Sequence, residues 1–352
     1  MATNSSTLHS EAATPVPAET RLTPLWLFVV AVLLIETAMR VMPEGFMTRT
    51  VQHRAEEIRY LPPADVQLMG DSATSGIRAG LLERFIGQDY QVSNYALPGT
   101  SPLFNYFVLR RQIAAGKAPR VIVLAPHPFV WSDPLLDRFL SRFATPAESV
   151  QLLRDGVNLD HWLYGTLCRF SYTLRYREEF YSAITTGNLT FFRQLESSIT
   201  SVQNTRAKIG ATEPQPPLPG KSILDAGIVP PVLSAPIAIH SYNELYIEKF
   251  FELAEANGIR VIWLSLPVPE LLLDKPDRAE RTAVFSAFLN RMMAKHKNLS
   301  AISTAVPTMP DSYFMDAWHL NSYGAWVFSQ MAGEELADWL KLHSLSGGSA
   351  LP

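Results

Sequence analysis

The chain has 352 residues, of which 47% are hydrophobic, and its formal net charge is −3 at pH 7. This length and composition are sufficient for one large domain or two small ones with a buried core. The small net charge gives no indication of nucleic-acid binding. The single cysteine, Cys168, excludes an internal disulfide and a cysteine-based metal site, and we expect it to be a small buried residue.

The N-terminal part of the chain begins with a polar segment and continues with an apolar one. Residues 1–21 are rich in Ser, Thr, Ala and Pro, a composition that favours a disordered tail. The segment 22–35 is uncharged, and counting on to Met42, with Arg40 reaching toward the headgroups, gives the length of about 20 residues that a span requires. The sequence therefore predicts a transmembrane anchor over 22–42. A cleaved signal peptide, which Glu36 disfavours, and a buried core helix are the alternatives.

Apolar runs alternate with helical patterns through the rest of the chain. The predicted strands are 66–70, 90–96, 120–126, 259–267 and 299–304. The predicted helices are 78–87, 102–116, 243–258, 278–296 and 322–343. This alternation is typical of an α/β domain with a parallel sheet of about five strands and helices on both faces.

An insertion separates the third predicted strand from the helix that precedes the fourth. It is rich in aromatic residues and arginines, it is predicted to be mostly helical, and it ends in a proline-rich loop. It forms either a cap that faces the substrate or a packing subdomain. The predicted boundaries are 1–21 for the tail, 22–42 for the anchor, 43–63 for a linker, 64–131 and 241–342 for the α/β domain, 132–240 for the insertion and 343–352 for a flexible tail.

A Gly-Asp-Ser sequence, residues 70–72, follows the first predicted strand directly. Ser72 is either a nucleophile at the end of the strand or a residue that caps the following helix, because Gly, Asp and Ser are frequent at such turns. In either case we expect Ser72 to stand at a helix start, where the helix dipole favours a developing negative charge.

Asp316 and His319 lie just ahead of the last predicted helix. At this spacing, at the start of a helical turn, a carboxylate can orient the imidazole that follows it. The second ring nitrogen is then available to take a proton from a serine. Because the strands of a parallel sheet end at one edge, we expect Ser72, Asp316 and His319 to converge there.

These motifs resemble those of the SGNH, or GDSL-like, hydrolase superfamily. The resemblance rests on residues 70–72, on Gly99 after the second strand and on the Asp-Ala-Trp-His sequence 316–319, and it covers about 64–342 apart from the insertion. It implies a flavodoxin-like fold. The membrane-anchored layout resembles the O-acetylation proteins of bacterial exopolysaccharide systems and the D-alanyl transfer protein of teichoic acids.

The same resemblance implies roles for individual residues. Ser72 would be the nucleophile, His319 the base and Asp316 its orienting partner. The backbone N–H groups of Ser72 and Gly99 would help to form the oxyanion hole. One position departs from the pattern, because His127 occupies the place where the superfamily usually has an asparagine that donates to the oxyanion. His127 either replaces that donor or packs under the insertion.

A serine nucleophile with a histidine base performs acyl transfer to water or to a hydroxyl group. We therefore expect an acyl esterase or O-acyltransferase that acts on a cell-surface or exported polysaccharide. The expected acyl group is O-acetyl. Trp131 and Trp318 are predicted to stack on sugar rings, or else to be core residues. No cofactor, metal or nucleic acid is expected, whereas a multi-spanning acyltransferase or polysaccharide synthase is a candidate partner. The alternative is a scaffold or binding protein with the same fold and little or no catalytic activity.

The expected location follows from two conflicting features. Arg40, Arg49 and Arg54 follow the apolar segment, and by the positive-inside rule they favour a cytoplasmic domain. An anchored acyl-transfer domain is nevertheless most useful where polysaccharides emerge. We therefore predict a single-pass protein of the bacterial inner membrane with its main domain on the periplasmic side.

Overall fold

The computed structural model describes residues 19–41, 61, 63–87, 89–127, 131–175, 177, 181, 185, 214–216, 239–272 and 278–345. The proline-rich loop of the insertion lies almost entirely outside these residues. So do nearly all of the predicted linker 43–63, most of the N-terminal tail 1–21 and most of the C-terminal tail 343–352.

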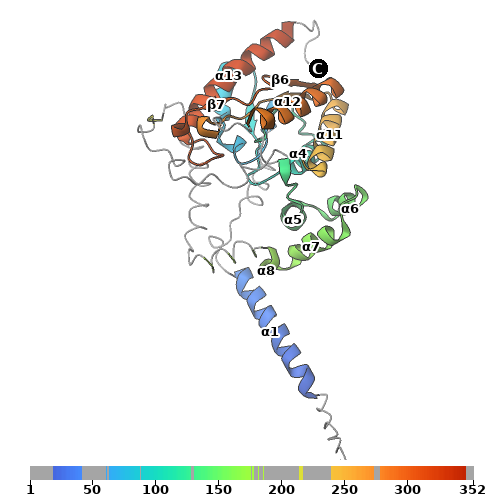
Figure 1. Cartoon of the computed structure of the whole chain (residues 1–352). Helices are drawn as coiled ribbons and strands as arrows, with labels where there is room; N and C mark the ends of the chain where they lie inside the picture. Colours follow the sequence, from blue (N-terminus) through green and yellow to red (C-terminus); the bar gives the residue numbers. More distant parts are fainter. Residues whose placement is uncertain are drawn as a thin grey trace, which may run out of the picture.

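A five-stranded parallel sheet forms the centre of the molecule (Figure 1). Its strands are β1 Val66–Met69, β2 Val92–Asn94, β3 Val121–Leu124, β4 Arg260–Trp263 and β6 Leu299–Ala301. The order is β2-β1-β3-β4-β6, and every neighbouring pair is parallel. The predicted α/β class and the five strands are confirmed, and this strand order is consistent with a flavodoxin-like fold.

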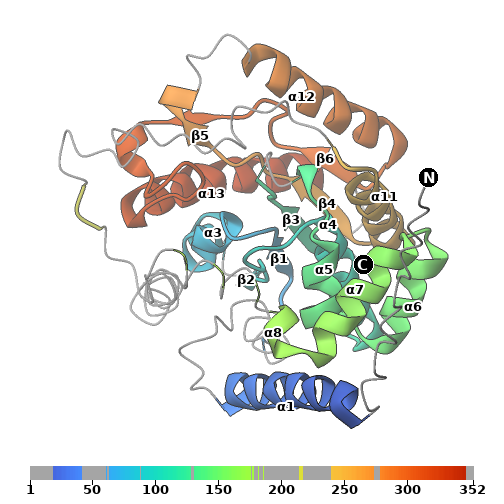
Figure 2. The ribbon, with the colours of Figure 1, turned by 60° about the horizontal axis from the view of Figure 1, so that its bottom comes forward.

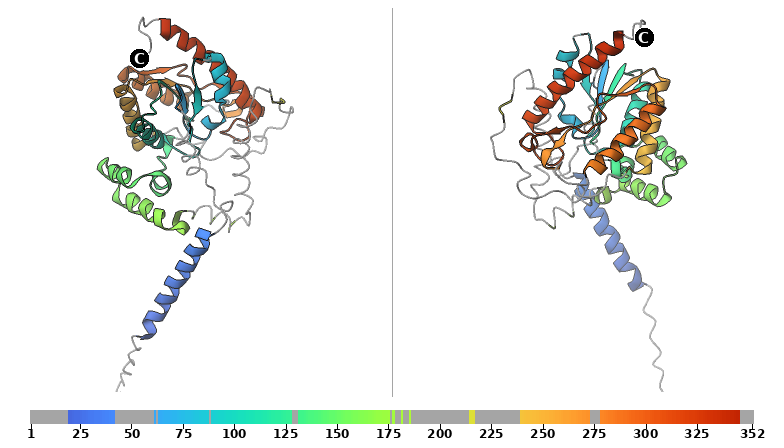
Figure 3. Two further views of the ribbon diagram at one scale, coloured as in Figure 1. Left: turned by 180° about the vertical axis from the view of Figure 1, so that it is seen from behind. Right: turned by 45° about the horizontal axis from the view of Figure 1, so that its top comes forward.

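Helices cover both faces of the sheet (Figure 3). One face carries α3 Ala79–Ile86 and α13 Ser322–Leu345. The other carries α4 Pro102–Ala114, α11 Ser241–Ala256 and α12 Arg278–Lys295. Three of these helices, α3, α4 and α12, lie within the predicted ranges, whereas α11 begins two residues earlier and α13 ends two residues later than predicted. Each segment combines a long apolar face with a start or stop residue.

The central strand β3 shows why its sequence forms a buried strand. All four residues are buried, but they alternate in direction. Val121 and Val123 pack with the α13 side of the core, and Ile122 and Leu124 with the α4 side. A strand buried on both faces needs such a continuous apolar run, since successive side chains point to opposite faces.

The described part of the insertion is helical, as predicted. It contains α5 Leu136–Arg138, the π-helix η3 Phe139–Phe143, α6 Pro146–Arg154, α7 Leu159–Phe170 and α8 Tyr172–Arg175. Phe139 lies 5.0 Å from Phe104 and 4.9 Å from Phe107 of α4, measured between ring centroids. The beginning of the insertion therefore belongs to the core on the α4 side, which is a packing role.

The apolar N-terminal segment forms helix α1, Glu19–Val41, which projects from the end of the molecule where α8 lies (Figure 2). In the part of the chain that the structure describes, no helix combines the length and the apolar character needed to cross a membrane. The predicted span over 22–42 is therefore not supported. Glu36, which ends the uncharged run, contacts the domain by accepting hydrogen bonds from the backbone N–H groups of Tyr172 and Thr173, at 2.9 and 3.2 Å.

A second, two-stranded parallel sheet was not predicted. It consists of β5 Val268–Pro269 and β7 Thr308–Met309 and leads into the 3₁₀ helices η6 Glu270–Leu272 and η7 Asp311–Tyr313. Strands of two residues are too short to leave a period in the sequence. This small sheet matters because the loop that carries Asp316 and His319 follows η7.

Candidate active site

Ser72 lies in the loop that follows β1, but it does not cap a helix as expected. The next element is the 3₁₀ helix η1, Thr74–Gly76, which has no side-chain cap, and α3 begins only at Ala79. Asp71 Oδ1 instead accepts a hydrogen bond from the backbone N–H of Ala73, the residue just ahead of η1, at 2.8 Å. A single 3₁₀ turn has few aligned peptide dipoles. η1 therefore does not provide the helix dipole that was expected to stabilise negative charge at Ser72.

Gly70 allows the loop to fold back onto β3. A Cβ atom at this position would lie 2.1 Å from the Thr74 hydroxyl oxygen and 2.8 Å from the Ala125 carbonyl oxygen. The Thr74 hydroxyl donates to that same carbonyl. From the other side, the Asn94 amide at the end of β2 donates to the carbonyl oxygen of Thr74 at 3.1 Å. The loop is thus fixed from both neighbouring strands.

Asp71 connects the same loop to the segment after β3. Its Oδ2 accepts a hydrogen bond from the His127 backbone N–H at 2.7 Å, and the side chain is buried. Burial raises the pKa of the Asp71 carboxyl, against the opposing effect of the N–H groups of His127 and Ala73. The sequence motif drew attention to residues 70–72, but this bridging role of Asp71 was not predicted, since it requires knowledge of which strand neighbours β1.

Asp316 and His319 lie in a loop between η7 and α13, not in a helical turn. The loop is closed by an antiparallel bridge between Phe314 and Leu320, and the Met315 N–H donates to the His319 carbonyl at 2.8 Å. Asp316 Oδ1 accepts from the backbone N–H of His319 at 2.7 Å. The three-residue spacing therefore places the carboxylate under the imidazole through a side-chain turn rather than through a helix.

Two further residues hold this loop in place. Asn321 donates to the Ser312 carbonyl at 2.7 Å and accepts from the Gly324 N–H at 2.9 Å, which caps the start of α13. Arg78, which follows η1, donates to the Ser322 carbonyl at 3.0 Å. The loop after β1 and the start of α13 are therefore joined directly, next to the candidate site.

The side chains of Ser72, His319 and Asp316 form one connected row. His319 Nε2 lies 2.8 Å from Ser72 Oγ, and His319 Nδ1 lies 2.7 Å from Asp316 Oδ2. The convergence expected from the order of the strands is present in the structure. A hydroxyl within hydrogen-bond distance of an imidazole, which is oriented in turn by a carboxylate, is an arrangement that activates the hydroxyl as a nucleophile.

The charges within this row stabilise a protonated imidazole. Burial acts to lower the pKa of His319, but the hydrogen bond and the charge of Asp316, together with the charge of Asp71, raise it above the ordinary value. Burial acts to raise the pKa of Asp316, but His319 and the backbone N–H of Trp318 bring it below its usual range. Asp316 is therefore ionised at neutral pH, as an orienting residue must be.

Gly99 lies in the loop after β2, with a φ of +63°. Arg138 from α5 donates to the Gly99 carbonyl at 2.9 Å, and its Nη1 would lie 2.4 Å from a Cβ atom at that position. The insertion thus contacts the loop that was predicted to contribute an oxyanion donor. That role of the Gly99 N–H, like that of the Ser72 N–H, stays a prediction.

His127 is buried, and its backbone N–H is bonded to Asp71, the residue before Ser72. Its ring lies 4.9 Å from the Trp318 ring in an edge-on arrangement with an interplanar angle of 70°. Burial, followed by the positive charge of His319, lowers the pKa of His127 to about 3, so its imidazole is neutral at physiological pH. A neutral imidazole carries one N–H that can donate a hydrogen bond. The proposed oxyanion role of His127 stays a prediction.

Of the two roles expected for Trp131, sugar stacking and core packing, the structure shows core packing. Its side chain is fully buried and packs against Trp263 and Phe288, with ring centroids 5.7 and 5.2 Å away. A core indole of this kind has no face left for a ligand. Trp318 is half-buried and adjacent to His319, so its predicted role remains compatible with its position. Cys168 is buried, as expected.

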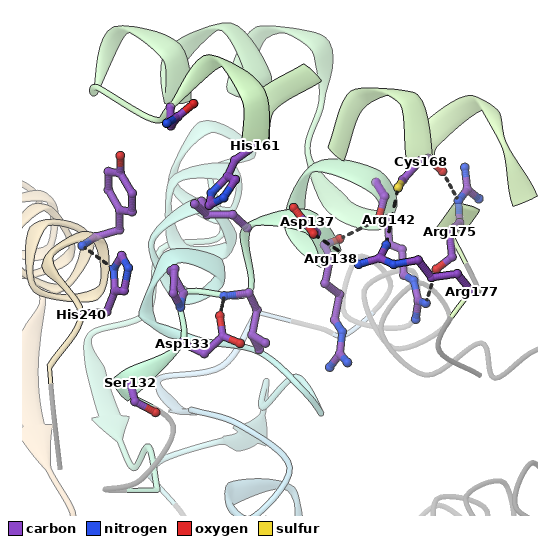
Figure 4. Close-up of a pocket in the computed structure, with 16 residues that line it drawn as sticks. Ser132, Asp133, Asp137, Arg138, Arg142, His161, Cys168, Arg175, Arg177 and His240 are labelled. Carbon is purple, nitrogen blue, oxygen red and sulfur yellow. Dashed lines mark hydrogen bonds and ion pairs between the residues drawn. The ribbon is translucent and has the colours of Figure 1, made fainter. Parts of the chain in front are cut away.

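A cavity of about 450 Å³ lies between the insertion and the start of α11 (Figure 4). Asp133, Arg138, Arg142, His161 and His240 are among the residues that line it. Ser72, Asp316 and His319 are not among its lining residues, so it is separate from their row. Arg138 connects the two regions, because it lines the cavity and also contacts Gly99.

The sequence of the chain matches no family model and no curated protein.

Proposed function

We propose that this chain is a serine esterase or O-acyltransferase of the SGNH type. The observation that carries the proposal is the continuous row of contacts from Ser72 Oγ to His319 Nε2 at 2.8 Å and from His319 Nδ1 to Asp316 Oδ2 at 2.7 Å. Loops anchored to several strands position these groups, so little movement is needed before reaction.

The proposed reaction has two half-steps. In the first, His319 takes the proton from the Ser72 hydroxyl while the serine oxygen attacks the acyl carbon of an ester. The bond to the alcohol then breaks, His319 returns the proton to the departing alcohol, and an acyl-serine remains. In the second, water or a sugar hydroxyl attacks the acyl-serine in the same way. This regenerates Ser72 and releases either a carboxylic acid or a new ester.

The proposed substrate is an acylated polysaccharide at or beyond the cell surface, with O-acetyl as the expected acyl group. The half-buried Trp318 beside His319 supports a sugar-facing role for this edge of the site. A multi-spanning acyltransferase or a polysaccharide synthase is the partner that would deliver the acyl group or the glycan.

The proposed location is the periplasmic side of the bacterial inner membrane, with attachment through α1. Large apolar side chains of α1 are exposed around the helix, including Trp26, Leu27, Phe28, Leu33 and Leu34. Exposed apolar side chains on several sides of one helix favour a non-aqueous environment over solvent.

A second candidate function is a scaffold that binds a polysaccharide or an acyltransferase without turnover. It is favoured by His127, which stands where an asparagine donor is expected. The backbone N–H of His127 is bonded to Asp71, and its ring packs against Trp318. Loss of one oxyanion donor costs about 2.7–4 kcal/mol of transition-state stabilisation in a well-studied protease.

The purified full-length chain, incubated with p-nitrophenyl acetate, separates the candidates. An esterase releases p-nitrophenol in buffer alone. A transferase releases it faster when an unacylated glycan is added and produces an acetylated glycan. Activity that persists in Ser72→Ala would contradict the proposed chemistry. Binding of the glycan without turnover under either condition would favour the scaffold.

A further inference from the structure

Helix α7 and the following α8 carry a row of exposed apolar side chains. We call this row the α7 stripe, and its members are Leu159, Leu163, Leu167, Phe170 and Leu174. Their side chains are between 37% and 68% exposed. The spacing of four, four and three residues places the four members on α7 along a single helical face. Leu174 continues the row on α8, after the extended residue Ser171.

The opposite face of α7 is already buried against the domain. Gly165 packs so closely on η3 that a Cβ atom there would lie 2.7 Å from the Leu140 Cβ atom, and Cys168 is buried on the same side. With about 3.6 residues per turn, a side chain two positions away points to nearly the opposite side. Leu163 and Leu167 therefore point away from the domain. α7 is thus apolar on two opposite faces, of which η3 covers only one.

The α7 stripe lies at the same end of the molecule as α1. Figure 1 and Figure 2 both show α7 and α8 along the edge from which α1 projects. Glu36 of α1 accepts hydrogen bonds from the Ser171 hydroxyl and from the N–H of Tyr172, which joins α1 to the start of α8. The stripe and the exposed apolar surface of α1 are therefore neighbours, fixed to each other by a polar contact.

Tyr164 and Arg177, which lie beside the α7 stripe, are residue types found at membrane interfaces. Tyr164 lies one helical turn before Cys168 and is partly exposed, and the Arg177 guanidinium stands 4.6 Å above its ring. Tyrosine is enriched at the level of the lipid headgroups, and arginine keeps its charge in the headgroup region while its stem covers apolar surface.

We propose that the α7 stripe docks on the surface of a lipid bilayer, with its leucines at the boundary between headgroups and acyl chains. The inference rests on the proposed membrane location. Lipid is the occupant because the stripe adjoins α1, whose apolar side chains face several directions, as lipid contact requires and a single protein partner does not. Attachment at both α1 and the stripe would fix the orientation of the catalytic domain above the membrane.

Spin labels on the full-length chain test this inference. In a Cys168→Ser background, a nitroxide is attached to a cysteine placed at Leu163 or Leu167, and for comparison at Met331, an exposed position on α13 outside the stripe. The protein is bound to vesicles of phosphatidylcholine and phosphatidylglycerol. Relaxation of each label by oxygen, which concentrates in the bilayer, is compared with relaxation by a water-soluble nickel chelate.

Labels at Leu163 and Leu167 should be relaxed mainly by oxygen, and the label at Met331 mainly by nickel. Stripe labels that respond to nickel, although the protein is bound to the vesicles, would overturn the docking inference alone. So would stripe labels that neither reagent reaches, since a protein surface would then cover them. A chain that does not bind the vesicles at all would overturn the membrane attachment as well.

A double substitution provides a second readout. Leu163→Glu with Leu167→Glu should lower partition of the full-length chain into these vesicles several-fold, whereas Met331→Glu should leave it unchanged. Hydrolysis of p-nitrophenyl acetate in solution should be the same in both variants, because none of the three positions contacts Ser72, His319 or Asp316. Unchanged partition of the double variant would contradict the docking inference. Absence of hydrolysis in the wild-type chain would instead contradict the proposed esterase activity.

Discussion

His319 Nε2 lies 2.8 Å from the Ser72 hydroxyl oxygen, although the two residues are 247 positions apart in the chain. The contact is maintained by two connections that involve neither residue directly. Arg78 joins the loop after β1 to the first residue of α13, and Asn321 fixes the loop that precedes α13. The His319 imidazole is therefore held against the Ser72 hydroxyl by contacts outside the pair.

Asp316→Asn should reduce turnover of a small acetyl ester strongly, by up to roughly 10⁴-fold, as in a serine protease with the same substitution. The amide can keep the backbone hydrogen bonds of the loop, but its N–H₂ group can face His319 Nδ1 and favour the wrong tautomer. Steady-state rates would be compared with those of Asp338→Asn, which removes an exposed carboxylate on α13. Equal rates for Asp316→Asn and wild type would exclude Asp316 as the orienting residue.

The dependence of activity on pH should show an acidic limb above the ordinary histidine pKa of 6.5, because the pKa of His319 is raised. His319 must be neutral to accept a proton, so kcat/KM should fall as the pH drops through that pKa. In Asp316→Asn the limb should move to lower pH, since the main groups that raise the pKa are lost. His127, with a pKa of about 3, should contribute no limb. A rate that stays flat between about pH 5 and pH 8 would argue against His319 as the base.

Asp71→Ala should destabilise the fold, because the N–H groups of Ala73 and His127 would lose their acceptor in a buried site. Each unsatisfied group costs about 1–3 kcal/mol. Asp71→Asn should cost less, since one oxygen can still accept and burial already disfavours the charged carboxylate. Urea denaturation would measure the free energy of unfolding. A value for Asp71→Ala within about 0.5 kcal/mol of wild type would show that the bridge is unimportant.

Reporter fusions after Pro352 should place the domain outside the cytoplasm. Alkaline phosphatase is active only when exported, so its fusion should be active. Green fluorescent protein fluoresces poorly after export through the unfolded route, so its fusion should be dim. A bright fluorescent fusion with an inactive phosphatase fusion would place the domain in the cytoplasm, as Arg40, Arg49 and Arg54 favour. The polysaccharide proposal would then lose its main support.

The sequence was sufficient to predict the sheet and the order of its main helices, because long segments such as 102–116 and 120–126 have clear periods and end at turn residues. The nearness of Ser72 to Asp316 and His319 was also predictable, since parallel strands end at one edge. The local backbone conformation of each motif was not predictable. The spacing of Asp316 and His319 fits a helical turn as well as a loop, and only the bridge between Phe314 and Leu320 decides between them.

Residues whose role depends on distant neighbours were also missed or misassigned. Trp131 follows a predicted strand end, as a ligand-binding residue would, yet its surroundings are Trp263 of β4 and Phe288 of α12. Nothing in the sequence near Trp131 indicates these contacts. Asp71, Asn94 and Arg78 hold the loops of the site through partners on other strands and helices, and their roles became visible only with the fold.

Covalent labelling of the full-length chain with a fluorophosphonate, followed by peptide mass spectrometry, tests whether His319 activates Ser72 as a nucleophile. Such probes react with serines that a base has activated. We expect a single modified serine, Ser72, in the peptide that contains residues 70–76. Labelling should be lost in Ser72→Ala and His319→Ala and retained in Ser75→Ala. Modification of another serine, or no labelling of a correctly folded wild-type chain, would contradict the claim that Ser72 is a nucleophile activated by His319.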